Sequence, residues 1–424
     1  MKKHPVRHLL GAATGLVLAL PLAVHAGSFT GLGDLPGGLT DSLAFAISGD
    51  GNVVVGRAES ENGAEAFRWS PAMGMVGLGD LPGADFFSEA RGASQDGSVI
   101  VGTGRSELLG AEPFRWTAAD GMVGLGDFPD ASCPFCQRAA NGVSADGSVV
   151  VGFAGGLVNV EAFRWTAATG MVRLGTVPGA EQSLAEAVSA AGTVVVGRTN
   201  TEGFRWTEAE GMMGLGDLGG TTLPYALSEA YGISADGNVI VGGARDSADQ
   251  DQAFRWTTTG GMEGIGILPG ETFNAAGDAS ADGSVIVGIA RGFFTERDTA
   301  FIWTRDAGLR SLKQVLQDDY QLDLSGWILV AATAVSDDGQ TVAGYGVGPS
   351  GFQEAWVATL SSAPSCPGDC AGDGVVTISD LVLAVNVALG SATVSECPAA
   401  DRNGNGQVEI NELIAAVNAA LGGC

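Results

Sequence analysis

The feature that most constrains this chain is a motif that recurs seven times, with a period of about 47 residues. Each copy has a Ser-x-x-Gly turn, a run of Val and Ile that ends at Gly, and an aromatic segment that ends at Trp. The turns open at Ser48, Ser94, Ser144, Ser189, Ser234, Ser280 and Ser336, and the tryptophans follow at Trp69, Trp116, Trp165, Trp206, Trp256, Trp303 and Trp356. Such a period indicates that each copy is one supersecondary unit packed against its neighbours.

Each copy predicts four short strands, as the third copy illustrates. The Asp-Gly pair at 146–147 is a strong hairpin signal between a strand over 139–143 and the valine run 149–151. The valine run is apolar at consecutive positions, so we expect both of its faces to be buried. The third strand is 162–165 and the fourth is 170–175. Seven radially arranged units of this kind describe a mainly β protein, a seven-bladed β-propeller.

The two ends of the repeat region favour a closed ring. The element Gly-Leu-Gly-Asp-Leu-Pro-Gly first occurs at 31–37, before any Trp-bearing strand, and the last unit has no such element after 356–360. We therefore expect the N-terminal copy to supply the missing strand of the last blade. An open solenoid would instead need capping repeats at its ends.

The first 26 residues predict a secretory signal peptide. Lys2, Lys3 and Arg7 precede an apolar run over 9–24, and Val24-His25-Ala26 is a small-residue cleavage site. No later stretch is long enough to span a bilayer. We expect a secreted or cell-surface protein, with a signal peptide (1–26), a seven-repeat propeller (27–362) and a C-terminal module (363–424).

Removal of the signal peptide limits the chemistry that remains. It carries all three histidines, His4, His8 and His25, and leaves 18 basic and 48 acidic residues, a formal charge of about −30. We expect such a chain to repel nucleic acid. Because the mature chain then has no His, it cannot form a Ser-His-Asp or Cys-His catalytic site or a His-ligated zinc site. Carboxylate-pair hydrolysis stays open, but no catalytic motif is present, so the sequence favours a non-catalytic protein.

The six cysteines suit an oxidising compartment. Cys133 and Cys136 form a Cys-Pro-Phe-Cys segment before the third blade, where a loop-stapling disulfide is favoured over a redox site. The other four lie near the C-terminus and predict a disulfide framework in which three connectivities are open: Cys366, Cys370, Cys397 and Cys424.

The Phe-Arg-Trp and Gly-Leu-Gly-Asp-Leu elements resemble the HAF family of extracellular repeats, whose units carry an Ala-Phe-x-Trp strand and then a Gly-Met-x-x-Leu-Gly strand. The resemblance covers most of 29–360, although the sixth copy has Phe301-Ile302-Trp303 and the last has only Ala355-Trp356-Val357. The family implies an extracellular location and little about activity.

The charged residues of the repeats have structural interpretations. We expect the turn aspartates to serve hairpin chemistry rather than calcium binding. We expect the repeated arginines to lie between blades, paired with carboxylates such as Asp80 or Asp127, rather than to form a ligand-binding ring: Arg68, Arg115, Arg164, Arg205 and Arg255. Irregular insertions are better places for function: 127–138, 219–231, 245–252 and 313–327.

The C-terminal module carries two matching units, 369–390 and 401–422, offset by 32 residues. The second fits a calcium loop, because oxygen ligands recur at the spacing that wraps them round one hard cation. Its ligands are the side chains of Asp401, Asn403 and Asn405, the backbone carbonyl of Gln407, Glu409 through water, and the bidentate Glu412, with Gly406 at the sharp turn.

The first unit is a less complete calcium loop. Its ligands are Asp369, Asp373, the backbone carbonyl of Val375, and Asp380. Ala371 removes the third-position ligand, so we expect a weaker Ca²⁺ site with water in the gap. The alternative is an acidic turn that caps a helix.

Each loop leads into a short predicted helix, 381–389 or 413–421, closed by Gly390 or Gly422. Paired loop–helix units without incoming helices resemble a dockerin type I module, a calcium-dependent plug that docks onto cohesin modules. The resemblance covers about 60 residues and implies an association with extracellular polysaccharide-degrading assemblies. Ile378-Ser379 and Ile410-Asn411 stand where dockerins often carry a Ser-Thr pair, and the four cysteines are atypical.

The sequence therefore favours a secreted, non-catalytic protein whose calcium-binding tail anchors a propeller to a cohesin-like or other surface protein. Two alternatives stay open. The propeller could bind or cleave a glycan. Alternatively, the chain could be a matrix protein in which calcium merely rigidifies the C-terminal tail.

Overall fold

The computed structural model describes residues 27–129, 136–156, 159–220, 227–292, 298–360, 367–371, 375–401 and 406–422. They divide into two compact units, one within 27–360 and one within 367–422. The first is built of strands with one short helix, and the second is helical. The predicted signal peptide lies outside the described residues.

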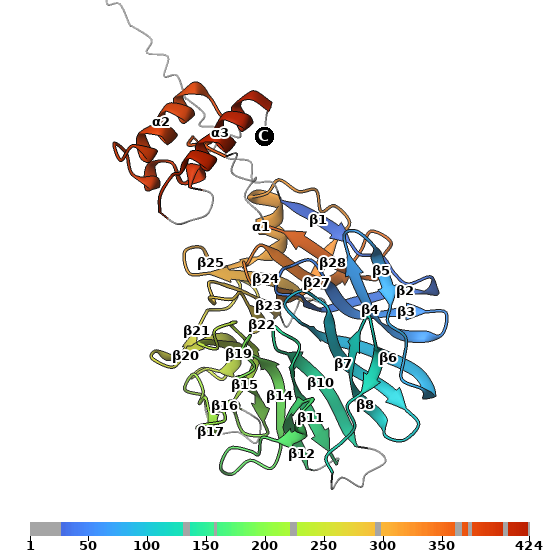
Figure 1. Ribbon diagram of the computed structural model, residues 1–424. Coiled ribbons are helices and arrows are strands. Elements are labelled where there is room, and N and C mark those ends of the chain that lie inside the picture. Colours follow the sequence, from blue (N-terminus) through green and yellow to red (C-terminus); the bar gives the residue numbers. More distant parts are fainter. Residues whose placement is uncertain are drawn as a thin grey trace, which may run out of the picture. The chain divides into compact units, whose positions relative to one another are not determined.

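The first unit folds into seven antiparallel sheets of four strands each (Figure 1). The inner strands are β2 (Gly37–Ile47), β6 (Gly83–Ala93), β10 (Gln137–Val143), β14 (Ser183–Val188), β18 (Ser228–Ile233), β22 (Phe273–Ala279) and β26 (Ile328–Val335). The second strands are β3 (Val54–Ser60), β7 (Val99–Ser106), β11 (Val149–Gly155), β15 (Val194–Thr199), β19 (Val239–Arg245), β23 (Val285–Arg291) and β27 (Thr341–Val347). The third strands are β4 (Gly63–Ser70), β8 (Gly110–Thr117), β12 (Val160–Thr166), β16 (Gly203–Thr207), β20 (Asp251–Thr257), β24 (Thr299–Thr304) and β28 (Gln353–Thr359). The outer strands are β5 (Gly74–Gly77), β9 (Gly121–Gly124), β13 (Gly170–Arg173), β17 (Gly211–Gly214), β21 (Gly261–Gly264), β25 (Gly308–Ser311) and β1 (Ser28–Gly31).

These sheets are the blades of a closed propeller. Each inner strand contacts the inner strands of both neighbouring blades, and β2 contacts β26 across the closure. In the seventh blade β1 pairs antiparallel with β28, from Ser28 opposite Thr359 to Gly31 opposite Trp356. The predicted seven-bladed ring, closed by an N-terminal strand, is confirmed. That strand lies just before the 31–37 element and shares only Gly31 with it.

The hydrophobic core lies between the blades. One aromatic residue of each third strand is fully buried: Phe67, Phe114, Phe163, Phe204, Phe254, Phe301 and Trp356. The valine run of the second strand is buried on both faces, as expected, because successive valines face different neighbours. Val150 packs in the cluster that contains Val101 of the preceding blade, whereas Val151 packs with Phe204 of the next. At about 1.5–3 kcal/mol for each fully buried side chain, these contacts hold the ring together.

The Ser-x-x-Gly turns close the inner hairpin of each blade. Ser144 Oγ donates a hydrogen bond to Asp146 Oδ1 (2.7 Å) and accepts one from Val149 N (3.0 Å). The fourth blade has Ala191 in place of the aspartate, and Ser189 Oγ still accepts a hydrogen bond from the corresponding backbone amide. The turn aspartates thus serve hairpin chemistry, as expected.

The same turns bond to one another around the ring, in an arrangement that we call the turn ring. Gln95 N donates to Ala145 O, and Ala145 N donates to Ala190 O, both at 3.0 Å. Asp337 N donates to Gly49 O at 2.9 Å, which carries the series across the closure between blades seven and one. Backbone hydrogen bonds therefore join neighbouring blades at one end of the central axis.

Of the repeated arginines, Arg205 pairs with a turn carboxylate as expected, that of Glu210 (2.7 Å), but Arg115 and Arg164 reach the next blade in another way. Arg115 Nε donates to Gly147 O (3.4 Å), the turn of the next blade. Asp127 instead pairs with Arg138 (2.5 Å), and Asp80 accepts hydrogen bonds from backbone amides of its own loop. At Arg115 and Arg164, backbone carbonyls of Gly147 and Gly192 thus take the place of the expected carboxylates, because the turn of the next blade lies within reach of the guanidinium.

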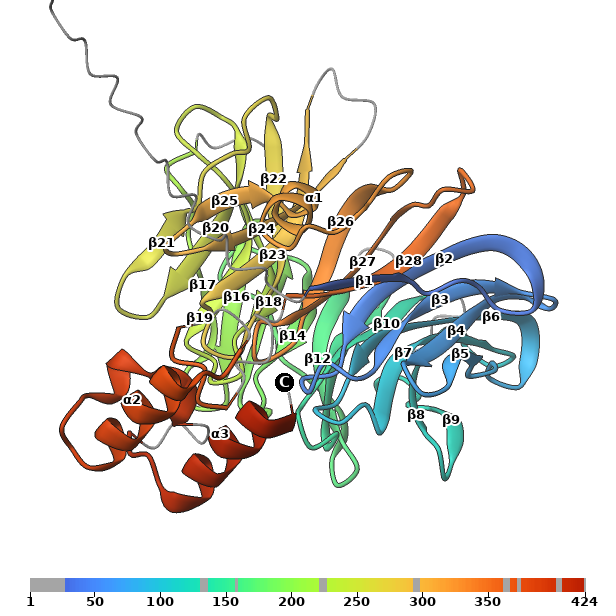
Figure 2. The ribbon, with the colours of Figure 1, turned by 90° about the horizontal axis from the view of Figure 1, so that it is seen from above.

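The insertion at 313–327 forms part of a blade edge. The helix α1 (Leu312–Asp318) lies against β24, β25 and β26 (Figure 2). It buries Leu312, Val315 and Leu316 in the core shared with the seventh blade. Trp327 packs edge-on against Phe29, with their ring centroids 4.9 Å apart. Trp327 therefore serves packing, and Tyr320 of the same insertion donates a hydrogen bond to Leu360 O (2.8 Å).

The second unit contains α2 (Ile378–Ala388), the 3₁₀ turns η1 (Val394–Glu396) and η2 (Pro398–Ala400), and α3 (Ile410–Gly422). Both helices begin three residues before the predicted starts at 381 and 413. In α2 the reason is a capping box, in which Thr377 precedes the helix and exchanges hydrogen bonds with Asp380. Among the described residues, no helix combines the length and the apolar character needed to cross a membrane.

Candidate functional site

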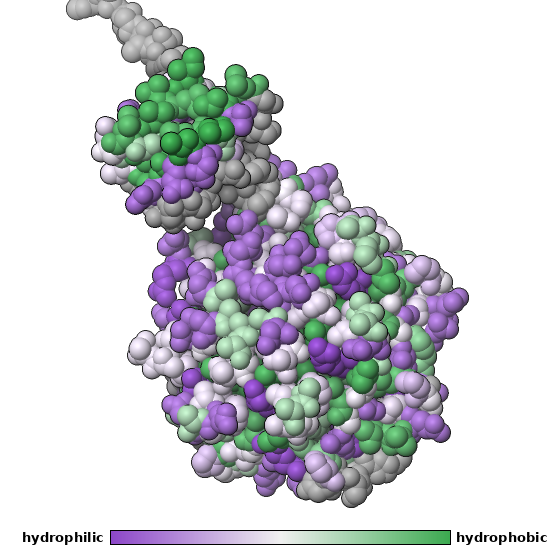
Figure 3. All heavy atoms as spheres, viewed as in Figure 1, coloured by the Kyte–Doolittle hydropathy of each residue, from purple (hydrophilic) through white to green (hydrophobic). Residues whose placement is uncertain are grey.

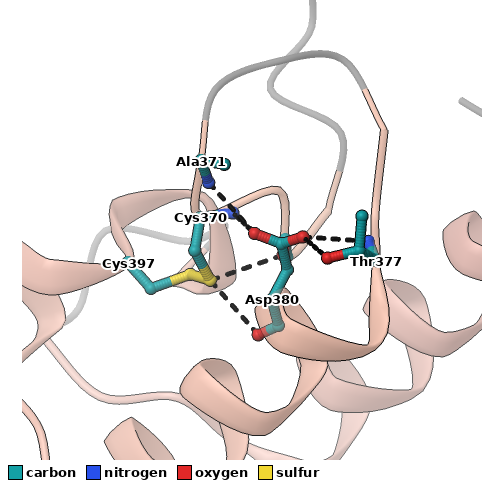
Figure 4. Close-up of a disulfide and its surroundings, with 6 residues drawn as sticks. Cys370, Ala371, Thr377, Asp380 and Cys397 are labelled. Carbon is teal, nitrogen blue, oxygen red and sulfur yellow. Dashed lines mark hydrogen bonds between the residues drawn. A yellow bond between two sulfur atoms is a disulfide. The ribbon is translucent and has the colours of Figure 1, made fainter.

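The carboxylate of Asp380 lies inside the first predicted calcium loop (Figure 4). Its Oδ1 accepts hydrogen bonds from Cys370 N and Ala371 N, both at 3.1 Å, and its Oδ2 accepts one from Thr377 N at 2.9 Å. Burial raises the pKa of Asp380, but the hydrogen bonds from Thr377, Ala371 and Cys370 outweigh that effect and lower it. The group is therefore ionised at neutral pH and faces the loop that it closes.

The second loop has the corresponding geometry. Gly406 N donates to Asp401 Oδ2 (2.8 Å), so the first loop carboxylate folds back over the sharp turn at the sixth position. Glu409 N donates to Glu412 Oε2 (2.9 Å), as Thr377 N does to Asp380 in the first loop. The two loops thus share one hydrogen bond between their ninth and twelfth positions.

The acidic residues at the ends of these loops are unusually buried for carboxylates. Asp369, Asp380 and Glu412 are only 4–6% exposed. Carboxylates are seldom buried unless they are paired or coordinate a metal. Side-chain and backbone oxygens are the donors that Ca²⁺ prefers, so these residues fit the ion predicted from the sequence.

The other predicted ligands are placed as follows. The Val375 and Gln407 side chains are exposed, which suits residues that would offer only backbone carbonyls. Asp373, Asn403 and Asn405 lie outside the described residues. Within the described part of the chain, no group of three or more His, Cys, Asp or Glu side chains is arranged to hold a metal.

A disulfide joins Cys370, at the second position of the first loop, to Cys397 in the connection between the helices. Cys397 is fully buried, in the small core with Ala384, Val387 and Val408. The bridge therefore ties the loop to the core, and it confirms part of the predicted framework. Cys366, Cys424 and Cys133 lie outside the described residues.

The outer faces of α2 and α3 form two apolar stripes, and a hydrophobic area is visible on the face of this unit that Figure 3 shows. Their eight side chains are 41–84% exposed. The stripes consist of Ile378, Val382 and Val385 on α2 with Leu389 at its C-cap, and Ile410, Ile414, Val417 and Leu421 on α3. Each member of the second stripe stands 32 residues after its counterpart, so the repeat in the sequence is also a repeat of the surface. These residues were not predicted as a site, although their spacing of 4, 3 and 4 marks one face of a helix.

The chain matches no protein-family model and no curated protein. Among solved structures it is similar to an oligogalacturonate lyase in complex with manganese, with a TM-score of 0.46 at 12% identity over 80% of this chain and 98% of the other. It is also similar to the β-propeller domain of the Trilobed protease from Pyrococcus furiosus, with a TM-score of 0.46 at 9% identity over 75% and 94% of the two chains. TolB from Acinetobacter baumannii gives a TM-score of 0.42 at 14% identity over 63% and 65%. At these identities the likeness concerns the fold alone.

Proposed function

We propose that this chain is a secreted, non-catalytic binding protein. In this proposal the C-terminal unit is a calcium-binding docking module of the dockerin type I kind, and it tethers the propeller to a cohesin-like protein. The observation that carries the proposal is the pair of equivalent apolar stripes on α2 and α3, each next to a loop with buried carboxylates.

The loops support calcium as the ion. Asp380 and Glu412 close their loops in the same way, and Asp401 turns towards Gly406, so the carboxylates at the loop ends face inward. The second loop carries more oxygen ligands than the first, in which Ala371 offers none from its side chain. Two Ca²⁺ sites of different affinity are therefore expected, with the tighter site at 401–412.

The stripes support a protein as the partner. An exposed apolar patch of this kind marks an interaction site. Helices that lie on membranes carry Lys and Arg on their polar face, whereas α2 and α3 contain neither residue. The two stripes carry no charged residue, so they suit contact with an apolar surface of a folded protein. A cohesin-like partner would link the propeller to an extracellular polysaccharide-degrading assembly.

Calcium binding is tested by isothermal titration of the full secreted chain after treatment with chelator. Two sites are expected, of which Glu412→Gln removes the tighter and Asp380→Asn removes the weaker. Glu208→Gln, which changes an exposed propeller carboxylate, should leave both unchanged. Absence of calcium binding at millimolar concentration would refute the calcium site.

Docking is tested with the full chain passed over immobilised cohesin modules, with calcium or with chelator. We expect retention only with calcium, and loss of retention in the double variant Ile378→Asp/Ile410→Asp. The matched control is Val123→Asp, which alters an exposed apolar residue of the propeller. If calcium binds and no cohesin retains the chain, the tail is a rigidified segment of a matrix protein instead.

A further inference from the structure

The axis of the propeller contains a cavity of about 210 Å³ that is lined by the inner strands of all seven blades. The turn ring contributes Gly49, Gln95, Ala145 and Asp337 to its wall. At about 30 Å³ for each water molecule, the cavity has the volume of roughly seven waters. Its size suits one small molecule.

The residues that give the cavity its chemistry stand at one position in each blade. Every inner strand has a β-bulge, and the residue that is skipped in the pairing lines the cavity. The seven bulged residues are Phe45, Arg91, Asn141, Glu186, Tyr231, Gly277 and Thr333. Bulges re-aim side chains and are frequent beside functional sites.

This position differs in every copy, although its surroundings are nearly uniform. The residue before the bulge is Ala in all seven blades, and the residue after it is Ala or Gly in six of them, with Asp278 in the sixth. A role in the fold alone would favour the same residue in each blade, as at the turn serines. The variation therefore points to a ligand that meets a different group on each side.

Four consecutive blades form a polar arc at the cavity. Asn141 Nδ2 donates to Glu186 Oε2 (2.8 Å), and Glu186 Oε1 accepts from Arg198 Nε (2.9 Å). Tyr231 donates through its hydroxyl to Glu229, which also pairs with Arg198 at 3.4 Å. These interactions fix the side chains before any ligand arrives. Hydroxyl, amide and carboxylate groups together can both donate to and accept from a ligand hydroxyl.

Arg91 extends this arc and is reachable from solvent. Its Nε donates to Glu89 Oε1 at 2.7 Å, and its side chain is 42% exposed. The guanidinium also lies 5.9 Å from the ring centroid of Phe45, in the neighbouring blade. Phe45, Gly277 and Thr333 form the opposite arc, which offers an aromatic ring, a methyl group and open backbone. The cavity therefore has a polar arc on one side and, on the other, Phe45 and Thr333 beside the carboxylates of Asp278 and Asp337.

One buried atom in the polar arc has no hydrogen-bond partner among the described residues. Asn141 is 8% exposed, and its Nδ2 donates to both Ala185 O (3.0 Å) and Glu186 Oε2. Two acceptors on the nitrogen fix the orientation of the amide, which leaves Oδ1 as the unsatisfied acceptor. Oδ1 itself is closed to solvent, so the amide acts on the cavity through the hydrogen bond that positions Glu186.

The charges around the cavity define the ligand further. Four carboxylates stand in or next to it, and they outnumber the two guanidiniums of Arg91 and Arg198: Glu89, Glu186, Glu229 and Asp337. Burial raises the pKa of a fifth, Asp278, to about 7, so this group adds little negative charge below that pH. An anionic ligand would be repelled. A neutral ligand with several hydroxyls on one side and C–H groups on the other matches both arcs.

We propose that the central cavity binds a neutral, polyhydroxylated ring of monosaccharide size, with its hydroxyls on the polar arc and its C–H face against Phe45. The test is saturation-transfer NMR and calorimetry of the full chain with glucose, galactose, mannose and xylose, and with glucuronate as the anionic probe. At least one neutral sugar should bind with a Kd of about 1–10 mM or tighter, and glucuronate about tenfold more weakly.

Two substitutions locate the binding. Tyr231→Phe and Asn141→Ala should each weaken the neutral sugar by about five- to tenfold, because each removes one hydrogen-bonding group. Tyr345→Phe removes a half-buried hydroxyl outside the cavity and should change the Kd by less than about twofold. Circular dichroism confirms that each variant is folded. The proposal is overturned if no neutral sugar binds, if glucuronate binds as tightly, or if neither cavity variant weakens binding.

Discussion

Replacement of Gly192 by Ala would test whether the turns fix the spacing between blades. Gly192 has a φ of +69°, which L side chains rarely adopt, and a Cβ there would lie 2.6 Å from Val149 Cγ2 of the preceding blade. Gly211, in the same blade, has a φ of +72°, and a Cβ there would meet only open space. The two positions therefore share the backbone strain and differ in the contact with the neighbouring blade.

The expected magnitudes follow from that difference. The left-handed backbone conformation costs an alanine about 1–2 kcal/mol at either position. Overpacking against Val149 adds about 1–3 kcal/mol at Gly192 only. We expect Gly211→Ala to destabilise the propeller by about 1–2 kcal/mol and Gly192→Ala by about 2–5 kcal/mol.

Guanidinium unfolding of the full chain, followed by tryptophan fluorescence, measures both variants against the parent. The fluorescence reports the propeller because all eight tryptophans lie within 27–360. Equal shifts in the two midpoints would show that the turn tolerates a methyl group against Val149 of the preceding blade. That result would refute the proposed contact between turn and neighbouring valine.

Three further predictions concern charge and cross-linking. Burial raises the pKa of Asp278 to about 7, so between about pH 4 and 7 the folded protein holds a proton that the unfolded chain releases. The free energy of unfolding should therefore fall by on the order of 4 kcal/mol as the pH rises from about 4 to 7. Asp278→Asn should flatten this dependence in thermal melts, and an unchanged pH profile would contradict the assignment. Arg138→Ala leaves the Asp127 carboxylate without its buried ion-pair partner and should lower the free energy of unfolding by about 3–5 kcal/mol, measured with denaturant. A decrease below about 1 kcal/mol would show that the pair contributes no more than an exposed surface salt bridge. Cys397→Ser opens a bridge between residues 27 apart in sequence and should destabilise the C-terminal unit by about 3 kcal/mol, measured by amide exchange of α2 and α3. Unaltered exchange would show that the unit does not depend on this bridge.

The repeat made most of the propeller predictable from the sequence. A strand pattern that recurs in register seven times averages out the ambiguity of any one copy, and the surplus N-terminal element predicted the closure. The partners of the repeated arginines were not predictable, because residues such as Arg115 and Gly147 meet only when the turn of the next blade is in place. The buried serines between blades were likewise missed. Ser88, for example, accepts a hydrogen bond from Ala66 N of the preceding blade.

The two candidate sites differ in what the sequence could reveal. The calcium loops are local motifs, so residue spacing was sufficient to name Asp401 and Glu412. The cavity is lined by one bulged residue from each blade, so no local motif in the sequence marks it. The bulge is a position that carries a different residue in each of the seven copies, directly after an Ala that stays constant, such as Ala140 or Ala185. Aligning the seven copies on their turn serines exposes that position from the sequence alone.

The pairing of β1 with β28 also bears on how the ring is made. Gly33 N bonds to Glu354 Oε1 across 321 residues of sequence, so the first strand has no partner until the last blade has been synthesised. Closing a loop of that length costs roughly 5 kcal/mol of chain entropy, yet an eighth repeat would add only about 0.1 kcal/mol. Chain length therefore hardly selects the number of blades. The number of blades is set instead by the angle between neighbouring blades, which depends on contacts such as Gly192 against Val149. The ring closes at the blade with which the first strand can pair.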